Sequence, residues 1–179
     1  MIIFKVIYFL VPYAFANMAP VLVKNYFKGL AYPLDSYKAL FGKRVLGDHK
    51  TWRGLIFGII GGIFGSLLQL FLAEFSFFQQ FMLFPITKSN VLLYGFLIGL
   101  GAIVGDAVGS FIKRRINVSP GQSLVPLDQF VGPVGVMIFL LPLYNVTVPV
   151  FFLALVVSFF FHLIIKRIGY FFKIENKKW

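Results

Sequence analysis

Four polar side chains follow one another at helical spacing near the end of a long apolar run. They stand at positions 0, 4, 7 and 8 of that spacing, and they are Asp106, Ser110, Lys113 and Arg114. On a helix these positions share one face. Asp106 precedes Ile112 by six residues, which places its carboxylate about 9 Å inside the apparent end of the run. A carboxylate at that depth faces a partner or a cavity, so the pattern predicts either a structural ion pair or a functional site.

Other segments offer groups that could join this site. The segment GDHKTWRG, residues 47–54, leads into an apolar run and carries Asp48, Lys50, Thr51 and Arg53. The segment SPGQSLVPLDQ, residues 119–129, is rich in turn residues and delivers Asp128 at the start of another run. Its Ser-Pro-Gly start favours exposed backbone amides that can meet a phosphate. Near the end of the first apolar run stand Asn17 and Pro20, where a proline can free backbone polar groups.

Hard carboxylate oxygens beside many cations indicate phosphate chemistry at a lipid boundary. Mg²⁺ prefers one or two carboxylates together with substrate phosphates, and Lys and Arg bind the remaining phosphate oxygens. Phosphoryl and nucleotidyl transfer need little more, because their catalysis is mostly positioning and charge neutralisation. The sequence has neither a GxxxxGK[ST] loop nor an HExxH motif. It has no cysteine, which excludes thiol catalysis and disulfides.

The composition is that of a membrane protein. Of 179 residues, 59% are hydrophobic and 19% aromatic, and the mean hydropathy is +0.88. Since a helix needs about 20 apolar residues to cross a bilayer, we expect one all-α integral membrane domain, residues 1–179, with five transmembrane helices. The expected spans are residues 2–23, 54–73, 91–112, 129–143 and 148–165. The net charge of +11 then indicates a membrane rim and anionic ligands, and no nucleic acid is expected.

The basic residues predict the orientation. With the N-terminus outside and the C-terminus cytoplasmic, only Lys5 and Lys88 of the 17 basic residues lie outside. Two expected cytoplasmic loops, about 24–53 and 113–128, carry the polar motifs, and five further basic residues follow the last span: Lys166, Arg167, Lys173, Lys177 and Lys178. The positive-inside rule favours this topology. The rival interpretation is a cleaved signal peptide ending at Ala14-Phe15-Ala16.

Glycines recur every four residues in the second and third apolar runs. The series are Gly54, Gly58 and Gly62, then Gly61 and Gly65, and then Gly101, Gly105 and Gly109. Small residues at this spacing let helices approach closely in lipid. The pattern therefore predicts a compact bundle in which Asp106 faces protein.

Together these motifs resemble the CDP-archaeol synthase family. The resemblance rests on ANMAP (residues 16–20), PLD (33–35), FG followed by KR, GDHKTWRG, GDAVGSFIKRR (105–115), SPG and LDQ, and it spans about two thirds of the chain. The distantly related bacterial-type CDP-diacylglycerol synthases share KTW-x-G, GD-x-x-x-S-x-x-KR and a PG loop followed by Asp. Their PGHGG is PGQSL here, their Asp-Arg is Asp128-Gln129, and no Lys-Asp pair follows Arg115.

The resemblance implies a reaction and roles for residues. CTP and unsaturated archaetidic acid would give CDP-archaeol and pyrophosphate, with Mg²⁺ as cofactor. The implied metal ligands are Asp106 and Asp128, with Asp48 as an alternative second ligand. Together with Lys113 these two carboxylates would be catalytic. Phosphate and nucleotide binding would fall to Ser110, Lys113, Arg114, Asp48, Lys50, Thr51 and Arg53, and Asn17 would contact substrate.

Two other functions stay open on the sequence. One is the same chemistry on phosphatidate, since apolar helices suit acyl and isoprenoid chains alike. The other is a small ion-coupled transporter with Asp106 as an intramembrane ion site. A transporter would spread polar groups along a path, whereas the outer halves of these runs are nearly free of charge. We therefore expect a plasma-membrane enzyme whose active site faces the cytoplasm, where CTP arrives.

Overall fold

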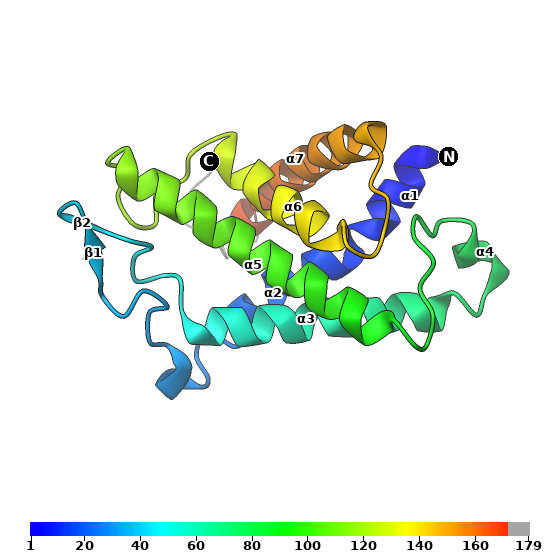
Figure 1. The fold of residues 1–179 in the computed structure, drawn as a ribbon, viewed down its shortest axis with the longest axis horizontal. Coiled ribbons are helices and arrows are strands. Elements are labelled where there is room, and N and C mark those ends of the chain that lie inside the picture. Colours follow the sequence, from blue (N-terminus) through cyan, green and yellow to red (C-terminus); the bar gives the residue numbers. More distant parts are fainter. Residues whose placement is uncertain (172–179) are drawn as a thin grey trace.

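The structure is a computed structural model that describes the backbone of residues 1–171 and the side chains of residues 1–164. Helices dominate it (Figure 1). The long ones are α1 (Ile2–Phe9), α2 (Val11–Leu22), α3 (Trp52–Leu72), α5 (Val91–Arg115), α6 (Leu127–Leu140) and α7 (Val148–Phe171). The shorter ones are η1 (Lys28–Leu30) and α4 (Ser76–Gln79). The five basic residues predicted after the last span lie outside the described side chains.

The expectation of an all-α chain is wrong in one detail. Strands β1 (Ala39–Leu40) and β2 (Lys43–Arg44) form an antiparallel hairpin, with Ala39 opposite Arg44. Its turn places Phe41 and Gly42 at positive φ, the backbone twist that favours two-residue hairpins. The hairpin lies between α2 and α3, within the predicted loop 24–53.

Three helical stretches have the length and composition of membrane spans. They are Ile2–Leu22, Trp52–Leu72 and Val91–Arg115. Two further apolar helices are shorter, Leu127–Leu140 and Val148–Ile164. The 14 residues of α6 extend only about 21 Å, less than the ~30 Å of a bilayer core. The described structure is thus mainly helical, with three clear candidate spans.

The first of these stretches is interrupted at Leu10, where α1 ends and α2 begins. Pro12 has no N–H, so the carbonyl of Tyr8, four residues earlier, receives no helical hydrogen bond from it. Gln69 of α3 donates its side-chain amide to that carbonyl, and the Tyr8 hydroxyl donates to the backbone carbonyl of Gln69 at 3.2 Å. The buried Gln69 thus gives the Tyr8 carbonyl a hydrogen bond at the helix break, because backbone polar groups in apolar surroundings need a partner.

Glycines let α5 pack tightly on two sides, which confirms the predicted close approach. A Cβ on Gly99 would stand 2.6 Å from the Cα of Ile59 on α3, and a Cβ on Gly101 would stand 2.8 Å from the carbonyl oxygen of Gly135 on α6. A Cβ on Gly105 would collide with the carbonyl of Val131. Because α5 holds both neighbours at backbone distance, its polar residues have fixed positions relative to α3 and α6.

The two polar connections meet at one end of the bundle. Segment 23–51, with the hairpin, and segment 116–126 both lie at the left of Figure 1, while segments 73–90 and 141–147 lie at the right. We call the first end the polar end and the second the far end. Asp106 and Asp128 belong to the polar end, near the last turns of α5 and the first turn of α6.

Gly99→Ala tests the helix contact. Alanine is better than glycine in a helix by about 1 kcal/mol, but overpacking of a tight contact costs about 1–3 kcal/mol. We expect a lower melting temperature in detergent, measured by thermal unfolding. Gly29→Ala is the matched control, since a Cβ there meets nothing within 4 Å, and it should leave the melting temperature unchanged or raise it. Equal melting of both variants would contradict the packing argument.

Candidate active site

A polar cavity of about 110 Å³ opens at the polar end, between α2, α3, α5 and segment 23–51. Its lining residues are Asn17, Pro20, Leu34, His49, Lys50, Thr51, Gly54, Ile103 and Asp106. Four residues predicted for the site, from three separate parts of the sequence, thus meet in one place: Asn17, Lys50, Thr51 and Asp106. His49 was not among the predicted site residues, although it belongs to the same GDHKTWRG segment.

Asp106 forms an ion pair within this cavity. The Nζ of Lys50 lies 3.3 Å from its Oδ2, and the two side chains are 23% and 29% exposed. The ion pair that the sequence offered as one of two explanations for Asp106 is therefore present. The pair is only partly buried and lines a cavity, so both side chains remain accessible to a ligand.

Asp128 of α6 forms a second ion pair with Lys113, which lies two helical turns after Asp106 on α5. Lys113 Nζ lies 2.7 Å from Asp128 Oδ1 and also donates to the carbonyl of Gln122 at 3.2 Å. The other carboxylate oxygen, Oδ2, accepts the backbone N–H of Leu124 at 2.9 Å. Asp128 stands in the first turn of α6, where the helix dipole favours a negative charge. Lys113 and Asp128 therefore hold segment 116–126 against the bundle.

Arg114 and Ser110 are the buried members of the polar stripe on α5. Both are 7% exposed, and Arg114 Nε donates to the carbonyl of Ser110 at 3.5 Å. Among the described residues, Nη1 of Arg114 is buried without a hydrogen-bond partner. A buried guanidinium with an unused N–H group is a ready donor for an anionic ligand.

The side chains that could ligate a metal can be compared with the Mg²⁺ that the sequence implies. Within the described residues, no group of three or more His, Cys, Asp or Glu side chains gathers to hold an ion. A structural metal cage built from protein alone is therefore not what these residues offer. Asp106 and Asp128 each lie beside a lysine, and one or two carboxylates together with substrate phosphates are the ligands that Mg²⁺ prefers.

Comparisons with known proteins agree along the whole chain. The family described as CarS-like, CDP-archaeol synthase, matches residues 1–179. The CDP-archaeol synthase of Pyrococcus furiosus is 33% identical over 181 residues, covering 99% of this chain and 98% of that protein. That of Methanococcus maripaludis is 34% identical, covering 99% and 96%. The chain belongs to the CDP-archaeol synthase family.

A solved structure supports the same assignment. An intramembrane enzyme for archaeal membrane lipid biosynthesis matches this fold with a TM-score of 0.70 and 30% identity, covering 88% of this chain and 90% of that chain. This member of the CDP-archaeol synthase family is therefore an enzyme of the membrane, as the sequence predicted.

Six residues predicted for the site do not line the cavity of this family member: Asp48, Arg53, Ser110, Lys113, Arg114 and Asp128. Asp48 has a side chain that is 62% exposed and pairs with Arg44 at 2.8 Å. Arg53 is also directed elsewhere, since its Nη1 donates to the carbonyl of Tyr26 at 3.0 Å. Thr51 lines the cavity, but its hydroxyl also caps α3 by accepting the N–H of Gly54 at 3.2 Å. The structure therefore gives Arg53 and Thr51 positions that also stabilise the polar end.

Asp35 organises segment 23–51 and was not among the predicted site residues. Its side chain is 1% exposed and bonds Arg44 at 2.8 Å, and its oxygens accept three backbone N–H groups, from Tyr37, Leu46 and Gly47. Burial alone would raise the pKa of this carboxyl, but the guanidinium and the three N–H donors outweigh burial and lower the pKa from 3.8 to about 2. The PLD segment was the available signal in the sequence.

Further contacts join segment 23–51 to α5 and to segment 116–126. Arg115 donates to the carbonyls of Leu40 and Arg44, both at 2.6 Å, and Lys43 Nζ donates to the Arg115 carbonyl at 2.9 Å. A Cβ on Gly47 would stand 3.6 Å from Pro120. The lysine that pairs with Asp106 thus sits on a segment that is fixed at several points.

Asp35→Asn tests this clamp. Since the folded pKa lies below the unfolded value, the stabilisation by the ionised carboxylate is present above pH 3.8 and is lost as the pH falls through about 2. At neutral pH it amounts to about 2 kcal/mol. We expect backbone hydrogen exchange in residues 33–47 to accelerate roughly 30-fold at pH 7.

Asp48→Asn provides the control for this prediction. Exposed ion pairs contribute about 0–1 kcal/mol, so exchange in the same segment should change little. If Asp35→Asn exchanges at the wild-type rate, the clamp is not what orders the segment.

Proposed function

We propose that this chain is a membrane cytidylyltransferase that converts CTP and unsaturated archaetidic acid into CDP-archaeol and pyrophosphate. The observation that carries the proposal is the pair of lysine-neutralised carboxylates, Asp106–Lys50 and Asp128–Lys113, at the polar end of an apolar bundle. It stands in a chain that matches the family along its full length. Both ion pairs offer a cation for phosphate and a carboxylate for a metal.

The reaction joins the lipid phosphate to the α-phosphate of CTP and releases pyrophosphate. An oxygen of the lipid phosphate attacks the α-phosphorus of CTP, a new P–O bond forms, and the bond to the β-phosphate breaks to release pyrophosphate. Negative charge accumulates on the phosphates throughout, so positioned cations lower the barrier. Lys113 and the unused N–H of Arg114 would bind these oxygens, and Lys50 would do so from the opposite side.

Mg²⁺ is part of the proposal. Asp106 and Asp128 would hold it, and when bound it would neutralise phosphate charge and orient the phosphates. The exposure of Asp48 and its pairing with Arg44 favour Asp128 over Asp48 as the second ligand. A lysine that leaves its carboxylate for a phosphate would keep the charge of the site balanced as substrate binds.

Five membrane crossings with the polar end in the cytoplasm complete the proposal. Helices α6 and α7 would form an antiparallel pair of crossings joined by the short segment 141–147. The described acidic side chains other than Glu74 lie at the polar end: Asp35, Asp48, Asp106 and Asp128. CTP would arrive from the cytoplasm, while the lipid phosphate would lie at the headgroup level. Carboxylates just inside the boundary could then serve both.

Asp106→Asn and Asp128→Asn test the site. The amide keeps the shape and loses the charge, so each variant should insert and purify but lose at least about 100-fold in turnover, the scale on which single electrostatic groups act. The assay supplies labelled CTP and a Mg²⁺ titration, with archaetidic acid and phosphatidic acid in parallel. Glu74→Gln, an exposed change at the far end, should keep wild-type turnover.

Three results would contradict the proposal. They are turnover of neither lipid by the wild type, wild-type turnover that does not depend on Mg²⁺, and near-normal turnover in either Asn variant. Preference for phosphatidic acid would move the substrate to the acyl class while leaving the nucleotidyl-transfer site in place.

Cysteine labelling tests the orientation, since the chain has no cysteine of its own. Gln122→Cys and Ser36→Cys stand in the two segments of the polar end, and Gln80→Cys stands at the far end; all three positions are exposed. In intact cells a membrane-impermeant thiol reagent should label only Gln80→Cys. Labelling of Gln122→Cys from outside would overturn both the topology and the use of cytosolic CTP. Protection of Gln122→Cys by CTP in opened membranes would support a nucleotide beneath that segment.

A further inference from the structure

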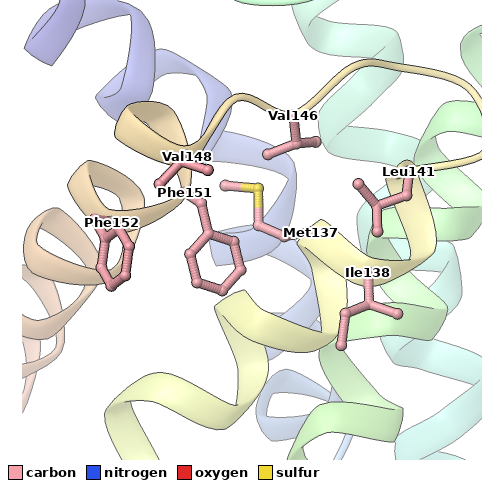
Figure 2. Close-up of a pocket in the computed structure, with 7 residues that line it drawn as sticks. All are labelled: Met137, Ile138, Leu141, Val146, Val148, Phe151 and Phe152. Carbon is pink, nitrogen blue, oxygen red and sulfur yellow. The ribbon is translucent and has the colours of Figure 1, made fainter.

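Among the described residues, two features stand apart from the polar cavity. One is an apolar recess of about 250 Å³ near the far end, where side chains from α6, α7 and the segment between them point toward one space (Figure 2). Its lining side chains, Met137 and Phe151 among them, are all apolar, so they offer nothing that would bind a charged group. The other feature is segment 24–32 at the polar end, which combines lysines with exposed aromatic rings.

Segment 24–32 lies outside the helix bundle, at the level where α3 begins. Figure 1 shows this stretch, which includes η1, below the first turn of α3, whereas the hairpin lies further along the long axis of the bundle. Since α3 has the length and composition of a membrane span, its first residue, Trp52, marks one boundary of the apolar layer. A segment beside the bundle at this level would lie at the depth of the lipid headgroups.

Contacts with α3 hold the segment in this place. The Nη1 of Arg53 donates to the carbonyl of Tyr26 at 3.0 Å, and the ring of Phe27 packs on the ring of Phe57 with centroids 4.8 Å apart. At the end of the segment, the backbone N–H of the first residue of α3 donates to the carbonyl of Tyr32 at 3.1 Å. The segment is therefore fixed beside α3 at both of its ends.

Large apolar side chains of this segment remain exposed although its backbone is fixed. Tyr26 is 67% exposed and Phe27 is 56% exposed, and Leu30 and Tyr32 are also exposed. Exposed apolar side chains that gather in one place mark a surface that meets a protein or a membrane. Tyrosine rings are enriched at the headgroup level, because one end of the ring is apolar and the other binds water.

The charges of the segment favour an anionic lipid surface as its partner. Residues 24–32 include no acid, and Lys24 and Lys28 are exposed. None of the ion pairs among the described side chains involves either lysine, since the neighbouring Asp35 and Asp48 both pair with Arg44. Cations next to a membrane span attract anionic lipids, and each cation changes their local concentration roughly fivefold.

We propose that segment 24–32 is a headgroup-binding surface that lies on the leaflet at the polar end and gathers anionic lipids of the surrounding bilayer. Lys24 and Lys28 bind the phosphate groups, and Tyr26 and Leu30 lie among the upper parts of the lipid chains. The segment starts four residues after Pro20, which lines the polar cavity, so the gathered lipids lie beside that cavity. The inference goes beyond the proposed function and holds whichever lipid phosphate is converted.

A fluorescent probe on Leu30→Cys tests the proposal in the full chain, which has no cysteine of its own. The protein is placed in phosphatidylcholine vesicles that contain, at equal mole fraction, either phosphatidylglycerol or phosphatidylcholine with a nitroxide in the upper acyl chain. Quenching should report a local concentration of the anionic lipid about fivefold above that of the neutral lipid. With Lys24→Gln and Lys28→Gln together, this ratio should fall to about one.

Lys38→Gln is the matched control, because it removes an exposed lysine of the same connection outside segment 24–32, and it should keep the wild-type ratio. A probe that is quenched by aqueous iodide and by neither lipid would face water or a protein, and equal quenching by both lipids would show no selection for charge. Either result overturns the inference.

A second probe position keeps the test decisive if Leu30→Cys fails to fold. Tyr26→Cys replaces a more exposed side chain of the same segment, and the same ratios are expected there. CTP is absent from all of these measurements, so their outcome is independent of turnover. Failure of this inference therefore leaves the proposed function in place, and an inactive enzyme would leave the lipid contact in place.

Discussion

Each of two carboxylates at the boundary of an apolar bundle has a cation close by, and much of the polar end follows from that requirement. An ionised carboxylate loses hydration there, and a partner charge restores part of the loss. Asp106 takes Lys50, which belongs to a connecting segment and not to a helix. That segment must therefore fold back over α5 and stay there. The clamp at Asp35 and the contacts of Arg115 with the hairpin hold it in that position. The ion pair of Asp106 thus depends on the fold of residues 23–51.

The packing of the helices also determines how close the paired charges lie. Glycine faces bring α3 and α6 to backbone distance on two sides of α5, and α5 carries Asp106 on the turns between those contacts. A bundle with larger residues at Gly99 or Gly105 would move α3 and α6 outward and separate Lys50 from Asp106 and Lys113 from Asp128. The small residues that allow association in lipid therefore also set the distances in the candidate site. Stability of the bundle and geometry of the site are properties of the same contacts.

Much of this arrangement could be predicted from the sequence, and the rest could not for physical reasons. Apolar length and glycine spacing are local signals, and they gave helices near their observed bounds and the close approach at Gly101 and Gly105. The family motifs assigned Lys50 and Asp106 to one site, but they did not name Lys50 as the cation that pairs with Asp106. The hairpin at 39–44 was missed because it is held by long-range bonds from Arg115, not by alternating side chains. Asp48 points outward and pairs with Arg44. The spacing of residues in a sequence does not show which cation a carboxylate will pair with.

Helix α6 has opposite chemistry at its two ends. Its first turn carries Asp128, where an N-terminal helix dipole and Lys113 favour charge, and its last turn ends in an apolar recess. A rigid helix fixes the distance between these two places. Lengthening α6 beyond Leu140 would fill the recess, and moving Asp128 outward would separate it from Lys113. The length of α6 therefore determines both the ion pair at its start and the recess at its end.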